Sequence, residues 1–185
     1  MSDELFDLEA AKNFDEDTLA KIFDTYAPVL YRYALRLTGD PQEADQIVGD
    51  VFARLLEKFA EGKGPSSNLR SYLFQIAYHV VVDNARERQR TVPIDIAENF
   101  LAEDDGLSGV VDERIKLDQV QAAIDTELTD EQRHVILLRY QEEFSLQETA
   151  NIVGKKVNAV KALQNRGVSK LRQVLDAMIQ TGSRQ

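Results

Sequence analysis

The sequence predicts an all-helical fold made of two small domains joined by a flexible acidic linker, the second domain containing a helix-turn-helix. Apolar residues repeat at spacings of three and four along most of the chain, whereas alternating strand patterns are scarce. Residues typical of helix N-caps and C-caps interrupt this pattern at several places. With 185 residues, the chain is long enough for two compact modules and short for a large catalytic fold.

Composition places the domain boundaries. We expect an acidic leader over residues 1–14, a first helical domain over 15–92, a linker over 93–113 and a second helical domain over 114–185. The linker is rich in carboxylates and poor in aromatic residues, so it cannot bury enough apolar area to offset chain entropy. The leader is predicted to be solvated or to face a partner.

Three amphipathic helices are expected in the first domain. An apolar stripe predicts the first of them, and its early members are Leu19, Ile22, Phe23, Tyr26 and Leu30. Asp40 followed by Pro41 is typical of a cap and first helical turn, and begins the second. Gly, Pro and Ser residues over 61–68 predict a loop. Apolar residues from Leu69 to Val81 then start the third helix.

Capping boxes mark the helices of the second domain. Thr129 with Gln132, and Ser145 with Glu148, have the spacing at which the two residues cap each other's backbone. Gly154 is expected to end the helix that Ser145 starts, and a further helix is predicted from Asn158 onward. This domain is therefore predicted to be a compact bundle of short helices.

Composition also excludes several classes of function. Cysteine is absent and only two histidines occur, which argues against disulfide frameworks and common zinc sites. There is no phosphate-binding glycine loop, nucleophile elbow or paired metal-binding histidine, so we expect neither an enzyme nor a cofactor. The acidic N-terminus lacks the apolar segment of a signal peptide, and no apolar run could span a bilayer. A cytoplasmic protein without membrane insertion is expected.

The segment from Ser145 to Arg172 has the form of a helix-turn-helix. Ala150, Gly154 and Val160 stand where that motif needs a small residue, a turn glycine and a buried branched residue. Although the net charge is −10, residues 155–172 contain six basic side chains and no carboxylate, as expected of a DNA contact. A helical hairpin without a DNA role remains open on these grounds. The candidate DNA-binding residues are Lys155, Lys156, Asn158, Ala159, Lys161, Ala162, Gln164, Asn165, Arg166 and Lys170.

The run from Val160 to Arg166, followed by Lys170 to Arg172, resembles the C-terminal domain of extracytoplasmic-function (ECF) sigma factors of the sigma-70 family. Residues 30–39, 44–52 and 68–90 resemble the three helices of that family's N-terminal domain, in the same order. The resemblance implies a bacterial RNA polymerase sigma factor that binds core polymerase, recognises and melts promoter DNA, and starts transcription of a specific regulon.

The same resemblance implies two further sets of site residues. Polymerase binding, through the coiled coil of the largest subunit, would involve Asp45, Gln46, Gly49, Asp50, Val51, Phe52 and Leu55. Binding and melting of the minus-ten element would involve Asn68, Arg70, Tyr72, Tyr78, His79, Asp83, Arg86 and Arg90. The C-terminal residues given above would bind the minus-thirty-five element. The implied partners are core polymerase, including its flap, promoter DNA and an anti-sigma factor.

The chain departs from the family pattern at several of these positions. The family usually has aspartate at Gln46, glutamine at Gly49 and asparagine at His79, and Tyr72 replaces its usual tryptophan. Promoter preference is therefore not transferred from the family. The residues also leave two other classes open, a stand-alone helix-turn-helix regulator that binds a symmetric operator without polymerase and a helical adaptor that binds only proteins.

Overall fold

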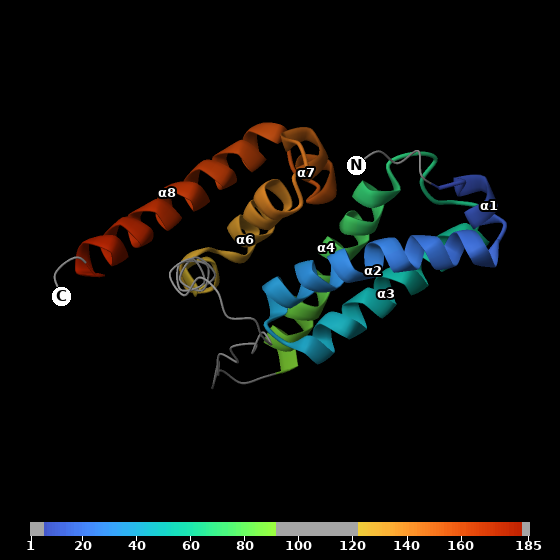
Figure 1. Ribbon diagram of the computed structural model, residues 1–185, viewed down its shortest axis with the longest axis horizontal. Coiled ribbons are helices and arrows are strands. Elements are labelled where there is room, and N and C mark those ends of the chain that lie inside the picture. The colour runs from blue at the N-terminus through green and yellow to red at the C-terminus, as the bar shows by residue number, and fades with distance from the viewer. Residues whose placement is uncertain (1–5, 92–121, 183–185) are drawn as a thin grey trace, which may run out of the picture. The chain divides into compact units, whose positions relative to one another are not determined.

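The computed structural model describes residues 6–91 and 122–182, and the regular structure of these residues is helical (Figure 1). The chain divides into two compact units, Met1–Ala102 and Glu103–Gln185. The predicted all-helical fold in two domains is confirmed. The predicted linker over 93–113 lies outside the described residues, and the domain limits drawn through it stay predictions.

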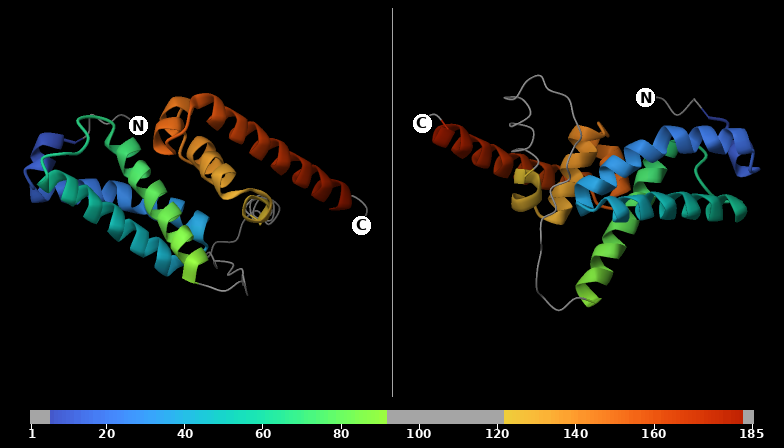
Figure 2. Two further views of the ribbon diagram at one scale, coloured as in Figure 1. Left: turned by 180° about the vertical axis from the view of Figure 1, so that it is seen from behind. Right: turned by 60° about the horizontal axis from the view of Figure 1, so that its bottom comes forward.

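The first unit consists of helices α1 (Leu8–Lys12), α2 (Glu16–Thr38), α3 (Pro41–Ala60) and α4 (Leu69–Thr91). Helices α2 and α3 lie side by side and run in opposite directions, and α4 packs across both of them (Figures 1 and 2). The chain reverses tightly between α2 and α3, and α3 begins at the predicted cap, Asp40 followed by Pro41. Gly39 ends α2 with a φ of 70°, and Asp40 caps α3 by accepting hydrogen bonds from the N–H groups of Gln42 and Glu43.

The core of the first unit is built from the apolar stripes of its three long helices. Tyr33 of α2 and Phe74 of α4 are fully buried, and their rings meet edge to face with centroids 5.2 Å apart. The largest other fully buried side chains of this unit are Ile22, Leu30, Ile47, Val51, Leu55, Leu69, Leu73 and Val80. One continuous core therefore fixes the orientation of α3 and α4, the two helices that carry the candidate binding residues.

The leader differs from its prediction. Helix α1 begins after Asp7, whose carboxylate accepts hydrogen bonds from two backbone N–H groups, and Ala11 is fully buried. The ring of Phe6 lies 5.8 Å from that of Tyr26 on α2. Residues 6–12 are thus part of the folded unit. A helix of five residues is too short to show a stripe of its own, and this explains why the sequence did not reveal it.

The described part of the second unit consists of a helical stretch over residues 122–127, α6 (Asp130–Ile136), η2 (Leu137–Gln141), α7 (Leu146–Ile152) and α8 (Val157–Gly182). Both predicted capping boxes are formed, with the side chain and backbone bonds present at each. Its core includes Ile124, Leu128 and Ile136, with Val168 and Leu171 of α8 packed against them. The segment η2 is a π-helix, which the sequence did not predict.

Gly167 allows α8 to pack closely on α6. A β-carbon at this position would lie 3.1 Å from Cγ1 of Ile136, tighter than an ordinary contact. Only a glycine fits here without a shift of its neighbours. The basic helix α8 therefore packs in close contact with α6 of the same unit.

Candidate nucleic-acid interface

Helices α7 and α8 form the predicted helix-turn-helix. Ala150 is buried where the two helices approach, Gly154 adopts a φ of 65° in the turn, and Val160 is fully buried. The three roles inferred for these residues are confirmed. Because Val160 and Leu163 face inward, the opposite side of α8 faces solvent over its first four turns.

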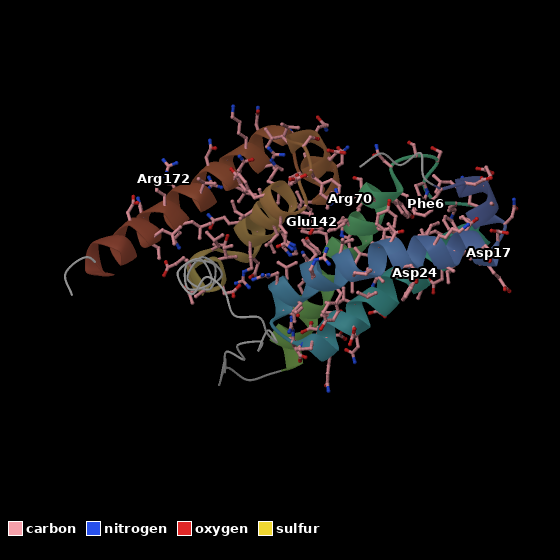
Figure 3. All side chains as sticks on the ribbon, in the orientation of Figure 1. Phe6, Asp17, Asp24, Arg70, Glu142 and Arg172 are labelled. Atoms are coloured by element: carbon pink, nitrogen blue, oxygen red, sulfur yellow. The ribbon has the colours of Figure 1, made fainter. Side chains whose placement is uncertain are left out.

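The exposed side of α8 is polar and basic. Its exposed members between Lys155 and Arg172 are Lys156, Asn158, Ala159, Lys161, Asn165, Arg166, Ser169, Lys170 and Arg172, while Ala162 is half-buried. Arg172 projects from α8 on the side away from α6 (Figure 3). Asn158, Ala162 and Asn165 follow one another at helical spacing along the middle of this surface, with cations on both flanks. We call this surface the α8 face.

Two of the predicted DNA-binding lysines have partners inside the protein. The Nζ atom of Lys155 lies 2.7 Å from a carboxylate oxygen of Glu131, and Lys170 donates a hydrogen bond to the carbonyl of Glu127 and lies 3.9 Å from its carboxylate. By contrast, Lys156, Lys161 and Arg166 make no ion pair within the described part of the chain. These three are the cations most available to an external anion.

Gln164 is also engaged within the second unit. Its side-chain oxygen accepts a hydrogen bond of 3.1 Å from Nε of Arg139, and its amide nitrogen donates one of 3.1 Å to the hydroxyl of Tyr140. Both polar ends of this side chain are therefore occupied. Neither Arg139 nor Tyr140 was singled out in the sequence, because these contacts span 24 or 25 residues and leave no local pattern.

Helix α4 brings most of the candidate minus-ten residues onto one face. Their numbers differ by seven, four and three, which keeps side chains on one side of a helix. These residues are Tyr72, His79, Asp83 and Arg86, and the side chain of the predicted Arg90 lies outside the described part of the structure. Within this set His79, Asp83 and Arg86 are exposed and Tyr72 is half-buried. We call this surface the α4 face.

Arg70 and Tyr78 lie elsewhere on α4. Arg70 is about half a helical turn away from Tyr72 around the axis, and its guanidinium lies 5.3 Å from the centroid of the Phe74 ring. Tyr78 is half-buried, with its ring 5.4 Å from that of His79. The structure therefore does not bring these two predicted residues onto the α4 face.

Charge pairs hold the α4 face against α3. Asp83 has Arg54 of α3 and Arg86 of its own helix each at 4.0 Å. Nearer the end of α4, Arg88 donates a hydrogen bond of 2.6 Å to Glu43, whose side chain is only 14% exposed. Burial raises the pKa of Glu43 and the positive charge of Arg88 opposes this. The pair ties the start of α3 to the end of α4.

The loop before α4 is held in a fixed shape. Gly64 has a φ of 122°, and a β-carbon there would meet the buried ring of Phe59 at 2.8 Å. Asn68 has a φ of 58°, which asparagine tolerates, and its carbonyl accepts a hydrogen bond of 3.0 Å from the N–H of Tyr72. Asn68 is thereby placed exposed at the start of α4.

The predicted polymerase-binding residues separate into surface and core. Asp45, Gln46, Gly49 and Asp50 are exposed on α3. Val51 and Leu55 are 0% and 1% exposed, so in this structure their side chains pack in the core and do not reach the surface, and their role in polymerase binding stays a prediction. Both lie on the stripe that faces α2 and α4, and family resemblance alone does not separate the two sides of a helix.

An exposed apolar cluster lies beside those acidic residues. Phe52 is half-buried on α3, and its ring lies 4.7 Å from that of Phe23 on α2. Phe23 is 47% exposed and Leu56, one turn after Phe52, is 37% exposed. Phe23 was expected within the buried stripe, but it follows Ile22 directly and so points about 100° away from it. We call Phe23, Phe52 and Leu56 the apolar cluster.

Two other kinds of site are absent from residues 6–91 and 122–182. No helix of these segments is both long enough and apolar enough to cross a membrane. In the same segments no group of three histidine or carboxylate side chains is arranged to hold a metal ion.

Comparisons with known proteins cover both units. Residues 22–91 match the family model described as Sigma-70 region 2, and residues 126–173 match that described as Sigma-70, region 4. The chain is 30% identical over 173 residues to the ECF RNA polymerase sigma factor SigX of Bacillus subtilis, covering 88% of this chain and 86% of SigX. It is 26% identical over 187 residues to SigW of the same species, covering 91% and 94% of the two chains.

A solved structure has a similar fold. The sigma factor RpoE of Bartonella quintana, determined in complex with the anti-sigma factor NepR, has a TM-score of 0.69 and 23% sequence identity to this chain. The match covers 89% of this chain and 98% of that one. At this identity the likeness concerns the fold.

Proposed function

Since this chain belongs to the ECF RNA polymerase sigma factors of the sigma-70 family, we propose that its first unit binds core polymerase and the minus-ten DNA, and its second unit the minus-thirty-five DNA. A sigma factor binds core polymerase, recognises and melts promoter DNA, and thereby starts transcription. The observation that carries the assignment of the second unit is the α8 face. It presents cations without carboxylates on a complete helix-turn-helix, in a chain of net charge −10.

The α8 face supports a division between base and phosphate contacts. Asn158 and Asn165 have amides that can donate to and accept from base edges in a major groove, and Ala162 between them suits an apolar contact such as a thymine methyl. Lys156, Lys161 and Arg166 surround these residues and suit phosphate oxygens. The two lysines paired with Glu131 and Glu127 contribute less, because DNA would first have to break their ion pairs.

The α4 face is suited to single-stranded DNA. Tyr72 offers an aromatic surface for stacking, and His79 and Arg86 offer donors and positive charge for a displaced strand. Asn68, held in place by its left-handed backbone, adds an amide at the start of the helix. In this proposal these groups bind the unpaired minus-ten bases, with a base flipped out of the duplex near the loop.

The polymerase contact is proposed for the exposed side of α3 together with the apolar cluster. Phe23, Phe52 and Leu56 supply apolar area that a partner can cover, and Asp45, seven residues before Phe52 on the same side of α3, supplies negative charge near it. An apolar centre with a charged rim is the usual anatomy of a protein interface. The partner element is the coiled coil of the largest polymerase subunit, and the flap is the proposed partner of the second unit.

An anti-sigma factor is a further proposed partner. The solved RpoE structure is a complex with such a protein, the anti-sigma factor NepR. Covering the apolar cluster would prevent binding to core polymerase. The sigma-70 family is not an enzyme family, so we infer that the chain acts by binding, in the cytoplasm where core polymerase is found.

A reconstitution experiment tests this proposal. The full chain is expected to co-elute with bacterial core polymerase and to support transcription from the upstream region of its own gene. The double variant Lys161→Glu, Arg166→Glu should weaken promoter binding about a hundredfold, on the basis of about 1–3 kcal/mol for each contacting side chain. Its matched control is Lys21→Glu, Arg32→Glu, which makes the same charge change at exposed positions on α2.

The alternatives predict different results. A stand-alone regulator would bind DNA tightly by itself and would not associate with core polymerase even at low salt. A protein-binding adaptor would show no salt-sensitive DNA binding at all. Either outcome, or an equal loss in the control variant, would contradict the proposal.

A further inference from the structure

The π-helical turn η2 lies directly before the helix-turn-helix. The N–H of Glu142 donates to the carbonyl of Leu137 at 3.0 Å, five residues back, in place of the usual four. Segment η2 forms the last turn of the helix that α6 begins, a place where π-type bonds commonly close a helix. It presents Arg139 and Tyr140 as consecutive residues toward the side of α8 that carries Gln164.

Arg139, Gln164 and Tyr140 form a chain of hydrogen bonds with a defined direction. Nε of Arg139 donates to Oε1 of Gln164, and Nε2 of Gln164 donates to Oη of Tyr140. Arg139 is anchored a second time, because its NH1 donates to the carbonyl of Phe144, just before the residue that caps α7. The Gln164 amide is thus oriented by the guanidinium.

This direction leaves the Tyr140 hydroxyl as an outward donor. A tyrosine hydroxyl has one hydrogen to donate, and here its oxygen already accepts from Gln164. The residue is 56% exposed, so its O–H can reach an acceptor in solution. This series of hydrogen bonds starts at the positive charge of Arg139, so each bond polarises the next and strengthens the Tyr140 hydroxyl as a donor.

The position of this donor points to an anionic acceptor. Gln164 lies three residues after Lys161, about 60° around the helix axis from it, so the donor stands at one edge of the α8 face. We propose that Oη of Tyr140 donates a hydrogen bond to a phosphate oxygen of the minus-thirty-five DNA, with Arg139 and Gln164 as positioning residues. This inference rests on the proposed function, in which α8 enters the major groove.

A neutral donor differs from the cations around it in one measurable respect. Lysine and arginine contacts to phosphate release counterions, so their removal lowers the salt dependence of binding, whereas a tyrosine hydroxyl releases none. Tyrosine is among the side chains that commonly contact the DNA backbone. The contact should therefore contribute affinity without contributing to the salt slope.

The experiment uses the reconstituted holoenzyme and a promoter duplex that contains the minus-thirty-five element. Tyr140→Phe removes only the hydroxyl and is expected to weaken binding about tenfold, as for loss of a hydrogen bond to a charged acceptor at the weaker end of its range. The salt slope should stay the same, while Arg166→Ala should lower it by about 1. Tyr31→Phe, on a half-buried tyrosine of α2, is the matched control and should change neither quantity.

Duplexes with a single phosphate replaced by a neutral methylphosphonate then locate the contact. At one position the substitution should weaken wild-type binding, and Tyr140→Phe should cost nothing further there. Gln164→Leu keeps the side-chain volume but removes the polar groups that position Tyr140. It should weaken binding to the unmodified duplex and have no further effect on the duplex with that one methylphosphonate. A Tyr140→Phe loss that is equal on every duplex would mean that the hydroxyl acts only within the protein, and would overturn the inference.

The two proposals fail in distinguishable ways. If Arg166→Ala weakens binding and Tyr140→Phe does not, the phosphate contact is refuted and the assignment of the α8 face stands. If neither variant has an effect on promoter binding, the assignment of the α8 face fails and the inference fails with it. Association of the Tyr140→Phe chain with core polymerase should match that of the wild type, and a loss there would assign Tyr140 to a protein contact instead.

Discussion

Helices α3 and α8 both carry a glycine in the middle of an amphipathic helix, and the two glycines have opposite surroundings. At Gly49 a β-carbon would have no neighbouring atom within 4 Å, whereas at Gly167 it would lie 3.1 Å from Ile136. The first glycine weakens a helix on a solvent-facing surface, and the second permits two helices to pack. The effect of a glycine in the middle of a helix is thus decided by the side chains that surround it.

The two helices also present opposite surfaces. The exposed side of α3 combines aspartates with the apolar cluster, while the α8 face has cations and amides and no large apolar side chain between Lys155 and Arg172 that is fully exposed. Apolar area with negative charge suits a protein partner, and positive charge with amides suits DNA. Each of these two helices therefore presents a surface suited to a different class of partner.

Truncation of the first core should have the largest effect on stability. Phe74→Ala removes a fully buried ring that packs on Tyr33, and should destabilise the first unit by about 3–5 kcal/mol. Amide hydrogen exchange, measured residue by residue, should show lost protection in α2, α3 and α4 only. Equal loss of protection in α6 and α8 would show that the two units unfold together.

Acid should weaken the second unit through His134. Burial, aided by the nearby charge of Arg133, lowers the pKa of His134 to about 3, against 6.5 for an unperturbed histidine. Between these values the unfolded chain binds a proton that the folded chain does not, so stability is lost as the pH falls from 6.5 toward 3. At pH 5 the loss should be about 2 kcal/mol.

Two variants isolate this contribution. Urea unfolding of His134→Leu, followed through the second unit, should lack this part of the pH dependence, whereas the exposed His79 gives a control in His79→Gln that should retain it. An unchanged pH slope in His134→Leu would assign the acid sensitivity of this unit to its carboxylates.

Gly167→Ala tests the close approach between α6 and α8. The added methyl group overpacks Ile136 at a cost of about 1–3 kcal/mol, which exceeds the gain of about 1 kcal/mol in helix propensity. We expect a net destabilisation of the second unit of about 1 kcal/mol in urea unfolding. If Gly167→Ala instead stabilised the second unit, the side chain of Ile136 would have moved to accommodate the added methyl group at little cost.

Gly49→Ala should have the smallest effect, with the opposite sign. The new methyl group meets no atom within 4 Å and Gly49 is exposed, so the first unit should gain about 0.5–1 kcal/mol from helix propensity alone. Thermal unfolding of the first unit measures this gain. A destabilisation would mean that the backbone at Gly49 is not freely helical.

Features with a local cause were predictable from the sequence. The capping boxes at Thr129 and Ser145 and the turn at Gly154 depend on residues within a few positions of each other. The two-unit helical fold followed from the spacing of apolar residues. Family resemblance then supplied the site residues, which periodicity alone would not have identified.

Features that depend on distant residues were not predictable. Lys155 and Lys170 resembled free cations until folding brought Glu131 and Glu127 beside them. Phe23 and Ile22 are equally apolar neighbours, and only the helix phase relative to α3 decides which one is buried. The burial of Val51 and the contacts of Gln164 likewise depend on the packed tertiary structure.

The π-turn makes the number of residues in its segment a structural requirement. A π-turn holds one residue more than an α-turn, so a chain with one residue deleted between Ile136 and Phe144 would close as ordinary helix there. The last turn would then present one side chain fewer toward α8, because a four-residue α-turn and a five-residue π-turn each complete about one circuit of the axis. A single deletion in this segment would therefore remove at least one of the two contacts with Gln164, which most substitutions leave in place.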